Sequence, residues 1–315
     1  MISAIAITGP TASGKTALSL DLGEKLGCEI ICCDSMQIYR RMDIGTAKAT
    51  ADEKARLPHH MLDVCEPWED YSAENYRQDA MRCAREIAER GKTPLFVGGT
   101  GLYIDTVMRG GAPESPPSDP ELHSRLLEGT DTAQGREQLW QRLKEVDPES
   151  AEKTHMNNAR RVARALEIYL LSGVTKTEFD KRSRLVTPDI SVRMLTLVFH
   201  NRDLLYERVD RRVDQMMSEG LVDEVRALYR DGALKPSGTA AMAIGYKELL
   251  EYIEGRQALS LAVEQIKQSS RRYAKRQLTW FRHESGAFRI YVDDEDGRIK
   301  SRDALLREAL YALAI

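Results

Sequence analysis

The sequence feature that most constrains this chain is a phosphate-binding pattern near its start. The residues that match G-x-x-x-x-G-K-[ST] are Gly9, Pro10, Thr11, Ala12, Ser13, Gly14, Lys15 and Thr16. An apolar run precedes them and a helical stretch follows, which is the context that such a loop needs. Glycines let backbone N–H groups turn inward around an anion, Lys15 supplies a charged donor, and Thr16 can hold Mg²⁺. The pattern predicts a loop that binds a di- or triphosphate, with an ordinary glycine turn as the alternative.

Strand-like and helix-like stretches alternate over the first part of the chain. Apolar runs at 5–8, 30–33 and 95–97 end in glycine or polar turns. A helix is predicted over 73–90, ended by Gly91, with an apolar face of Tyr76, Ala80, Cys83 and Ile87. Alternation of this kind is typical of a parallel sheet covered by helices, so we expect an α/β fold with a core like that of P-loop NTPases.

A Pro-rich passage at residues 112–120 interrupts this alternation. Beyond it the pattern is helical, and the clearest helix runs from Asn157 to Gly173 with an apolar face of Val162, Leu166, Tyr169 and Leu170. Runs at 191–199 and 288–292 then predict a return to the sheet, with a long helix over 258–283 between them. We therefore expect a core made of residues 1–112 and 189–315 and a mostly α-helical insertion domain at 113–188.

The overall charge balance argues against a general nucleic-acid binder. Lys and Arg number 46 against 49 Asp and Glu, a formal net charge of -3, whereas nucleic-acid-binding domains are usually basic. One segment, residues 265–283, has no acid and carries, among aromatic residues, Lys267, Arg271, Arg272, Lys275, Arg276 and Arg282. This segment suits a phosphate backbone; the alternative is a helix that buries its aromatic residues and leaves its charges in solvent.

The chain carries no sequence signal for export, membrane insertion or disulfide formation. No apolar run is long enough to span a bilayer, and the first residues lack the charged and apolar regions of a signal peptide. The 5 cysteines lack paired C-x-x-C spacing and are expected to be small buried side chains. We expect a soluble, cytoplasmic and monomeric protein.

Two further segments fall where strands of the predicted sheet end. Asp34 follows the run at 30–33, at the edge of the sheet where ligands gather, and a carboxylate there can accept a proton from a nucleophile. Capping of the next turn is an equally good interpretation of Asp34. The run at 94–97 ends in Gly98, Gly99 and Thr100, without the Asp that motor ATPases and GTPases use to organise Mg²⁺. Small-molecule kinases and transferases with a diphosphate leaving group remain as the candidate functions.

Eight segments, in order along nearly the entire chain, resemble the successive motifs of the tRNA dimethylallyltransferase family, also called tRNA isopentenyltransferases. They are residues 9–16, 34–39, 42–48, 58–60, 97–103, 160–167, 243–248 and 273–282. Collinear motifs of this number are far more specific than a phosphate loop alone. The chain ends at Ile315 without the zinc-finger extension of eukaryotic relatives, so it resembles the bacterial form.

The resemblance implies a reaction and a set of roles. Enzymes of this family transfer a dimethylallyl group from dimethylallyl diphosphate to N6 of the adenosine just 3′ of the tRNA anticodon, and release pyrophosphate with the help of Mg²⁺. The resemblance implies that Asp34 is the general base, that Thr100 contacts substrate and that Arg212 grips the diphosphate. It also implies that the phosphate loop stabilises the leaving group, with Thr16 as the metal ligand. A solvated charge on a helix is the alternative interpretation of Arg212.

The resemblance further implies contacts with the anticodon loop, which the family holds between its core and its insertion. The matching positions are Asp34, Ser35, Met36, Gln37, Thr100, His123, Arg160, Arg161, Val162, Ala163 and Arg164. Relatives often carry an arginine where this chain has His123, and Arg125 is the other candidate for that contact. A solvated face is the alternative for the arginine cluster. The rival functions are a nucleoside or small-metabolite kinase and an RNA-binding protein that uses a nucleotide as a structural ligand.

Overall fold

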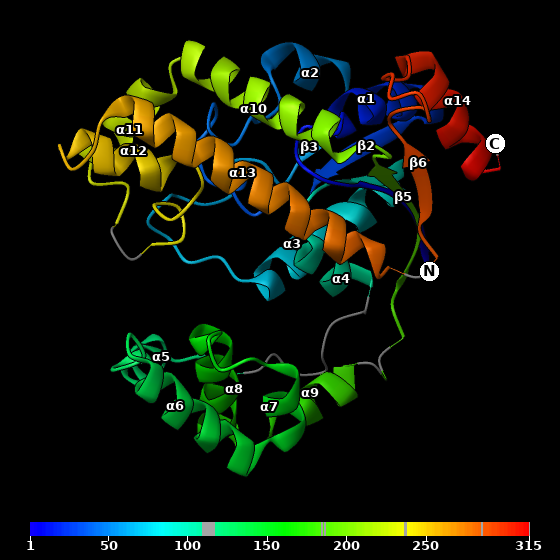
Figure 1. Ribbon diagram of the computed structural model, residues 1–315. Helices are drawn as coiled ribbons and strands as arrows, with labels where there is room; N and C mark the ends of the chain where they lie inside the picture. Colours follow the sequence, from blue (N-terminus) through cyan, green and yellow to red (C-terminus); the bar gives the residue numbers. More distant parts are fainter. Residues whose placement is uncertain (109–116, 184, 186, 236–237, 285, 315) are drawn as a thin grey trace. The chain divides into compact units, whose positions relative to one another are not determined.

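The computed structural model describes residues 1–108, 117–183, 185, 187–235, 238–284 and 286–314 (Figure 1). The chain forms two compact units. The first is made of Met1–Met108 and Ile190–Ile315, and the second is Arg109–Asp189. The insertion expected from the sequence, 113–188, lies inside the second unit.

The first unit is built on a six-stranded sheet in the order β3-β2-β4-β1-β5-β6. The strands are β1 (Ile2–Thr8), β2 (Cys28–Cys32), β3 (His59–His60), β4 (Thr93–Gly98), β5 (Ile190–Val198) and β6 (Phe288–Tyr291). Every pair of neighbouring strands is parallel. The predicted α/β fold with a helix-covered parallel sheet is therefore confirmed. The two-residue strand β3 was not predicted, because so short a strand has no period to detect.

Helices pack on both faces of this sheet and beside it. They are α1 (Lys15–Leu26), α2 (Ala51–Arg56), α3 (Ala73–Glu89), α4 (Gly101–Met108), α10 (Arg202–Ser218), α11 (Leu221–Arg230), α12 (Tyr246–Ile253), α13 (Leu259–Arg282) and α14 (Arg302–Ala312). Successive strand residues point to opposite faces, so Ala6 packs with α3 and α4 while Ile7 packs with α1 and α14. The predicted face of α3 is buried at Tyr76, Ala80 and Ile87, whereas Cys83 is only partly buried. Among the described residues, no helix meets the length and apolarity that a bilayer crossing requires.

The second unit is helical throughout the part that the structure describes. Its helices are α5 (Pro120–Leu127), α6 (Ala133–Val146), α7 (Pro148–Lys153), α8 (Ala159–Ser172) and α9 (Lys176–Ser183). Helix α8 buries Val162 and Leu166 against α5 and α6. Leu170 is 50% exposed, so its predicted place on the apolar face is wrong: the last turn of α8 lies beyond the residues that form this core.

The cysteines are free thiols. Cys28, Cys32, Cys33 and Cys65 are buried, as predicted, and Cys83 is half-buried. Burial raises the pKa of the Cys28 and Cys65 thiols to about 11, so both stay protonated at neutral pH. They act as small core side chains.

Candidate functional site

Three loops meet at the carboxyl ends of neighbouring strands. The phosphate loop (9–16) follows β1, Asp34 follows β2, and Gly98 ends β4, which lies between those two strands. A Cβ added to Gly98 would lie 2.1 Å from the Cys33 carbonyl oxygen, so only glycine permits this approach of β4 to β2. The Thr100 N–H donates to the Cys33 carbonyl at 3.1 Å, and the Thr100 hydroxyl accepts from the Ser35 N–H at 3.0 Å. The sheet thus brings the acid, the threonine turn and the phosphate loop to one edge.

The phosphate loop is shaped for an anion. Gly14 has a φ of 96°, which turns the backbone into the N-terminus of α1. The Lys15 ammonium donates to the carbonyls of Gly9 at 3.1 Å and Pro10 at 2.7 Å. The Ser13 hydroxyl is buried and has no hydrogen-bond partner among the described residues. A buried hydroxyl without a partner is costly, and a phosphate oxygen would satisfy it.

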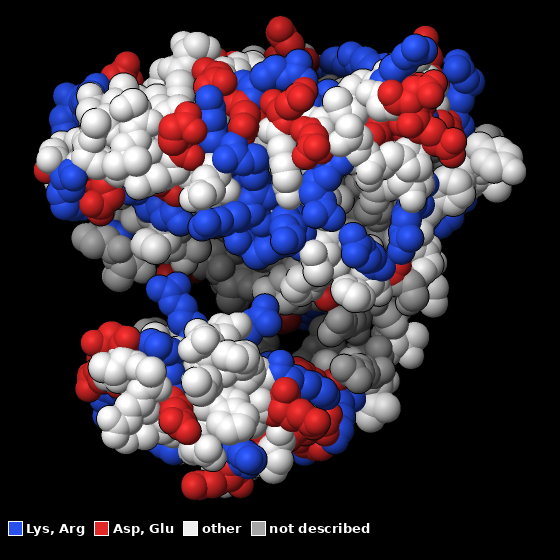
Figure 2. All heavy atoms as spheres, viewed as in Figure 1, with Lys and Arg blue, Asp and Glu red and all other residues white. Residues whose placement is uncertain are grey.

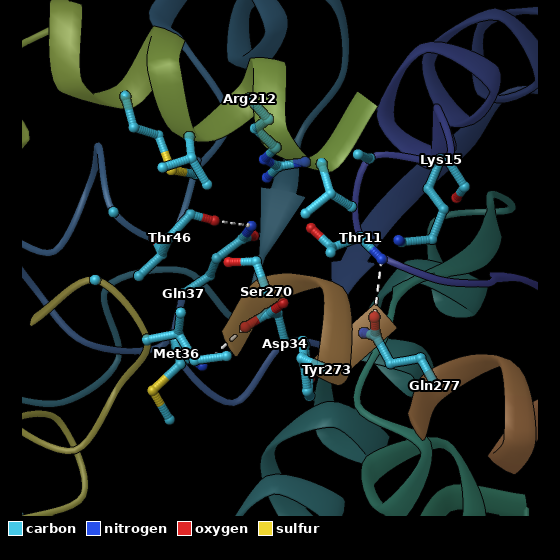
Figure 3. A pocket seen from close by; sticks show the side chains of 18 of the residues that line it. Thr11, Lys15, Asp34, Met36, Gln37, Thr46, Arg212, Ser270, Tyr273 and Gln277 are labelled. Carbon is cyan, nitrogen blue, oxygen red and sulfur yellow. Dashed lines mark hydrogen bonds between the residues drawn. The ribbon is translucent and has the colours of Figure 1, made fainter. Parts of the chain in front are cut away.

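A pocket of about 910 Å³ lies beside this loop (Figure 3). Figure 3 shows Lys15, Asp34 and Arg212 around the same space, with Arg212 supplied by α10. Its lining also includes an apolar group made of Met36, Val209, Val213, Met216, Leu221, Met242, Ile244 and Ile266. The pocket therefore combines a place for an anion, a carboxylate and an apolar wall.

The electrostatics of the pocket favour an anionic ligand. Burial lowers the pKa of Lys15 from 10.5 to about 7; the positive charge of Arg212 lowers it further, while Asp34 raises it. Burial also lowers the pKa of Arg212, and Asp34 again acts in the opposite direction. Two cations held close together and partly desolvated are stabilised by a bound anion, which restores the charged form of Lys15.

Two residues that were not predicted from the sequence, one on α13 and one on α10, form hydrogen bonds with the phosphate loop. The Gln277 carbonyl oxygen accepts from the Thr11 N–H at 2.8 Å, and its amide donates to the Gly99 carbonyl at 3.0 Å. Gln277 is buried and joins the phosphate loop to the threonine turn. The Arg208 guanidinium donates to the Ala12 carbonyl at 2.8 Å. The only sequence signal for Gln277 was its place in the segment 273–282 that resembles the family; Arg208 had none.

Tyr273, one turn before Gln277, also lines the pocket. Burial raises the pKa of Tyr273 to about 12, and the negative charge of Asp34 contributes to the increase. The phenol therefore remains protonated near Asp34 and can donate a hydrogen bond at neutral pH.

The segment that follows β2 forms one side of the pocket. Asp34, Ser35, Met36 and Gln37 all line it. One carboxylate oxygen of Asp34 accepts from the Met36 N–H at 2.9 Å, so Asp34 caps this turn, as the capping interpretation predicts. The other carboxylate oxygen accepts no hydrogen bond that the structure describes and is available to a ligand.

In the second unit, a buried carboxylate organises two of the residues expected to contact tRNA. Glu167 accepts from the Asp119 N–H at 2.7 Å and lies 3.0 Å from both the His123 imidazole and the Arg164 guanidinium. The charge and the donors around Glu167 outweigh its burial and lower the pKa of its carboxyl. Arg160, Arg161 and Arg125 are exposed.

Two of the expected tRNA contacts need correction. The side chains of Val162 and Ala163 are fully buried in the core of the second unit, against α5 and α6, and are not available to RNA. A segment of one helix turns its residues to different sides, so the cluster 160–164 presents only its arginines outward.

Helix α13 carries the basic segment seen in the sequence. Lys267 and Arg271 pair with Asp214 and Asp210 of α10 at 2.7 and 2.6 Å. Other cationic side chains of α13 are exposed, namely Arg272, Lys275, Arg276 and Arg282. Figure 2 shows Lys and Arg side chains gathered over this helix. The basic segment is thus partly paired with α10 and partly available at the surface.

The residues of the loop fit a magnesium ion that arrives with a diphosphate. Among the residues described, no group of three or more His, Cys, Asp or Glu side chains is arranged to hold a metal. Mg²⁺ bound to a phosphate ligand does not need such a group, because phosphate oxygens, water and one or two protein oxygens complete its shell. The exposed Thr16 hydroxyl lines the pocket and supplies an oxygen donor of this kind.

Comparisons with known proteins agree on one family. The family model described as IPP transferase matches residues 37–284, and the one described as isopentenyl transferase matches residues 2–63. The chain is 43% identical over 294 residues to the tRNA dimethylallyltransferase of Caldanaerobacter subterraneus subsp. tengcongensis, covering 93% of both chains. It is 48% identical over 281 residues to the enzyme of the same name from Geobacillus thermodenitrificans, covering 89% of this chain and 87% of that one.

Solved structures give the same result. The tRNA isopentenylpyrophosphate transferase of Bacillus halodurans has a TM-score of 0.71 at 39% identity, covering 100% of this chain and 97% of that one. A eukaryotic dimethylallyltransferase acting on tRNA has a TM-score of 0.80 at 28% identity, covering 100% of this chain and 80% of that one.

Proposed function

This chain belongs to the IPP transferase family, and from that membership we infer that it is a tRNA dimethylallyltransferase. It transfers a dimethylallyl group from dimethylallyl diphosphate to N6 of the adenosine just 3′ of the anticodon, and releases pyrophosphate. One observation carries the assignment of this chemistry to the pocket: the phosphate loop, Asp34 and an apolar wall line the same 910 Å³ space. A tRNA substrate also supports a cytoplasmic location.

The phosphate loop acts on the leaving group. The backbone N–H groups at the start of α1, the Ser13 hydroxyl, Lys15 and Arg212 hold the diphosphate and stabilise the negative charge that grows on it as the allylic C–O bond breaks. Thr16 would hold Mg²⁺, which would supply further positive charge to the diphosphate. The apolar wall excludes water from the allylic carbon.

Asp34 acts on the nucleophile. The exocyclic nitrogen of adenine must lose a proton as it forms the new C–N bond, and a carboxylate within hydrogen-bond reach accepts that proton. The hydrogen bond from the Met36 N–H holds one carboxylate oxygen, which leaves the other for the amino group. The Thr100 hydroxyl fixes the Ser35 backbone beside it.

The anticodon loop is a suitable source of this adenine. A base must leave its stack to reach Asp34, and a loop nucleotide is less costly to extrude than a duplex one. The exposed cationic side chains of α13 in the first unit, and Arg160 and Arg161 in the second, supply contacts with RNA phosphates. Selectivity then rests on loop shape and on the extruded adenine, which agrees with a net charge of -3.

A nucleoside or small-metabolite kinase would use the same loop and an acid to activate a hydroxyl. The apolar group around Met36, Met216 and Met242 favours a prenyl donor over a polar metabolite. The deciding experiment incubates the protein with unmodified tRNA, Mg²⁺ and either dimethylallyl diphosphate or ATP, and analyses the nucleosides by mass. Prenylated adenosine supports the proposal; ADP formation with an added small metabolite and no prenylated adenosine would overturn it.

The role of Asp34 has its own test. Asp34→Asn removes the proton acceptor and keeps the shape, so we expect tRNA binding within about twofold of wild type and a single-turnover transfer rate lower by about 10²- to 10⁴-fold. The measurements are filter binding and rapid-quench kinetics. A variant that transfers the prenyl group at the wild-type rate would exclude Asp34 as the base.

A further inference from the structure

The segment 42–48 and the segment 243–248 resemble family motifs but have no part in the chemistry described above. The first of these connects β2 to α2 and lines the pocket with Gly45 and Thr46. Its internal backbone bonds are few, from Ala47 N–H to the Ile44 carbonyl and from Lys48 N–H to the Asp43 carbonyl, each 2.9 Å. An irregular segment beside a binding pocket needs other anchors to keep one conformation.

The main anchor on its N–H side is Glu224 of α11. One carboxylate oxygen accepts from the backbone N–H groups of Asp43 at 2.8 Å and Ile44 at 2.7 Å. The other accepts from the Gly45 N–H at 3.0 Å and from the Tyr246 hydroxyl at 2.6 Å. Three consecutive backbone N–H groups form a concave anion site, and bonds to an ionised acceptor are stronger than those between neutral groups.

Tyr246 and Gly45 fit around this carboxylate. Tyr246 is fully buried, and a Cβ on Gly45 would lie 2.5 Å from its ring. Burial raises the pKa of Tyr246, and the charge of Glu224 raises it further, so the phenol stays a donor. The close contact between Gly45 of the segment 42–48 and Tyr246 of the segment 243–248 therefore explains both residues.

Backbone carbonyl groups of the same segment accept hydrogen bonds from Gln37. The Gln37 amide donates to the Thr46 carbonyl at 3.0 Å and to the Ala47 carbonyl at 3.2 Å. Its side-chain oxygen accepts from the Cys32 thiol at 3.1 Å. Figure 3 shows Gln37 bonded to the Thr46 backbone in the pocket wall beside Asp34.

We propose that Glu224 is a positioning residue for tRNA recognition, which holds the segment 43–47 and through it sets Gln37 against the target nucleotide. The inference rests on the proposed function, in which residues 34–37 contact tRNA. Glu224 itself touches no substrate. Lys48, bonded to Asp43 at 2.6 Å and Asp63 at 2.7 Å, anchors the end of the segment independently, so loss of Glu224 loosens the segment without releasing it.

The test is Glu224→Gln, which keeps the shape and turns an NH₂ group toward N–H donors. We expect the KM for tRNA to rise about tenfold, with the KM for dimethylallyl diphosphate and the rate at saturating tRNA within about twofold of wild type. Asp223→Asn is the matched control: it removes the same charge from the neighbouring exposed residue of α11, whose carboxylate pairs with Arg226 and with no other described residue, and leaves both KM values unchanged.

A double variant separates positioning from general destabilisation. If Glu224 acts through Gln37, the KM for tRNA of the Glu224→Gln, Gln37→Ala variant equals that of Gln37→Ala within about twofold, whereas independent effects multiply. If Glu224→Gln does not fold, Tyr246→Phe replaces it, because it removes one donor of four and should raise the same KM about threefold.

If the wild type is active, any one of three results would overturn this inference and leave the proposed function standing. They are an unchanged KM for tRNA in Glu224→Gln, an equal rise in both of its KM values, or effects that multiply in the double variant. A wild type that forms no prenylated adenosine would overturn the proposed function first.

Discussion

Lys15 allows a quantitative prediction about pyrophosphate binding. Its ammonium is buried in the phosphate loop beside Arg212, and burial lowers its pKa to about 7. At pH 7 the free protein therefore carries this group about half protonated. A diphosphate binds the protonated form far better, because it replaces the lost solvation with an opposite charge. Binding of pyrophosphate should thus take up a proton, and raising the pH should oppose it.

The size of the effect follows from the two pKa values. If the bound anion restores the pKa of Lys15 to its ordinary value of 10.5, the dissociation constant is nearly flat well below pH 7 and rises tenfold per pH unit above it. Between pH 7 and pH 9 the loss of affinity is about 50-fold. The sign is fixed by the lowered pKa: a group with a raised pKa would lose no affinity over this range.

Isothermal titration with inorganic pyrophosphate and Mg²⁺ measures this change. Pyrophosphate itself gains charge as the pH rises, so a reference protein is needed. Lys15→Arg stays protonated throughout, and the ratio of wild-type to variant dissociation constants isolates the lysine. Lys15→Met serves as a second reference, since its affinity follows the ligand's ionisation alone. A ratio that stays constant from pH 7 to pH 9 against either reference would refute the argument.

Three further predictions concern the contacts around the pocket and in the second unit. Gln277→Met removes two hydrogen bonds of a buried side chain and should raise the KM for dimethylallyl diphosphate about tenfold with the KM for tRNA unchanged; steady-state kinetics that show no such split would count against it. Gly98→Ala places a methyl group 2.1 Å from the Cys33 carbonyl and should lower the free energy of unfolding by about 3 kcal/mol in urea titrations; a loss below 1 kcal/mol would contradict it. Glu167→Gln removes the charged acceptor of His123 and should lower that free energy by about 2 kcal/mol, again by urea titration, and wild-type stability would be inconsistent with a structural role.

The sequence was sufficient for the parts of the site that follow strand ends. The phosphate loop and Asp34 come directly after apolar runs, and Thr100 follows another run after two glycines; parallel strands bring their carboxyl ends to one edge. Gln277 and Arg208 could not be found in this way, because they reach the loop from helices whose placement depends on packing between elements far apart in the chain. The same limit explains why Ala163 was wrongly expected to contact tRNA: whether a helical residue is exposed or buried depends on which helices pack against it.

The order of the strands also sets a length scale for the active site. Because β4 lies between β1 and β2, the phosphate loop and the acid leave the sheet two strand spacings apart, roughly 10 Å. At that distance a carboxylate repels each negative charge of the diphosphate by about 1.7 kcal/mol at an effective dielectric constant of 20, against about 4 kcal/mol at contact distance. A base on the adjacent strand would weaken binding of the very anion that must leave. In the proposed reaction, the intervening strand would separate the anionic leaving group from the anionic base, Asp34, so that one pocket can hold both.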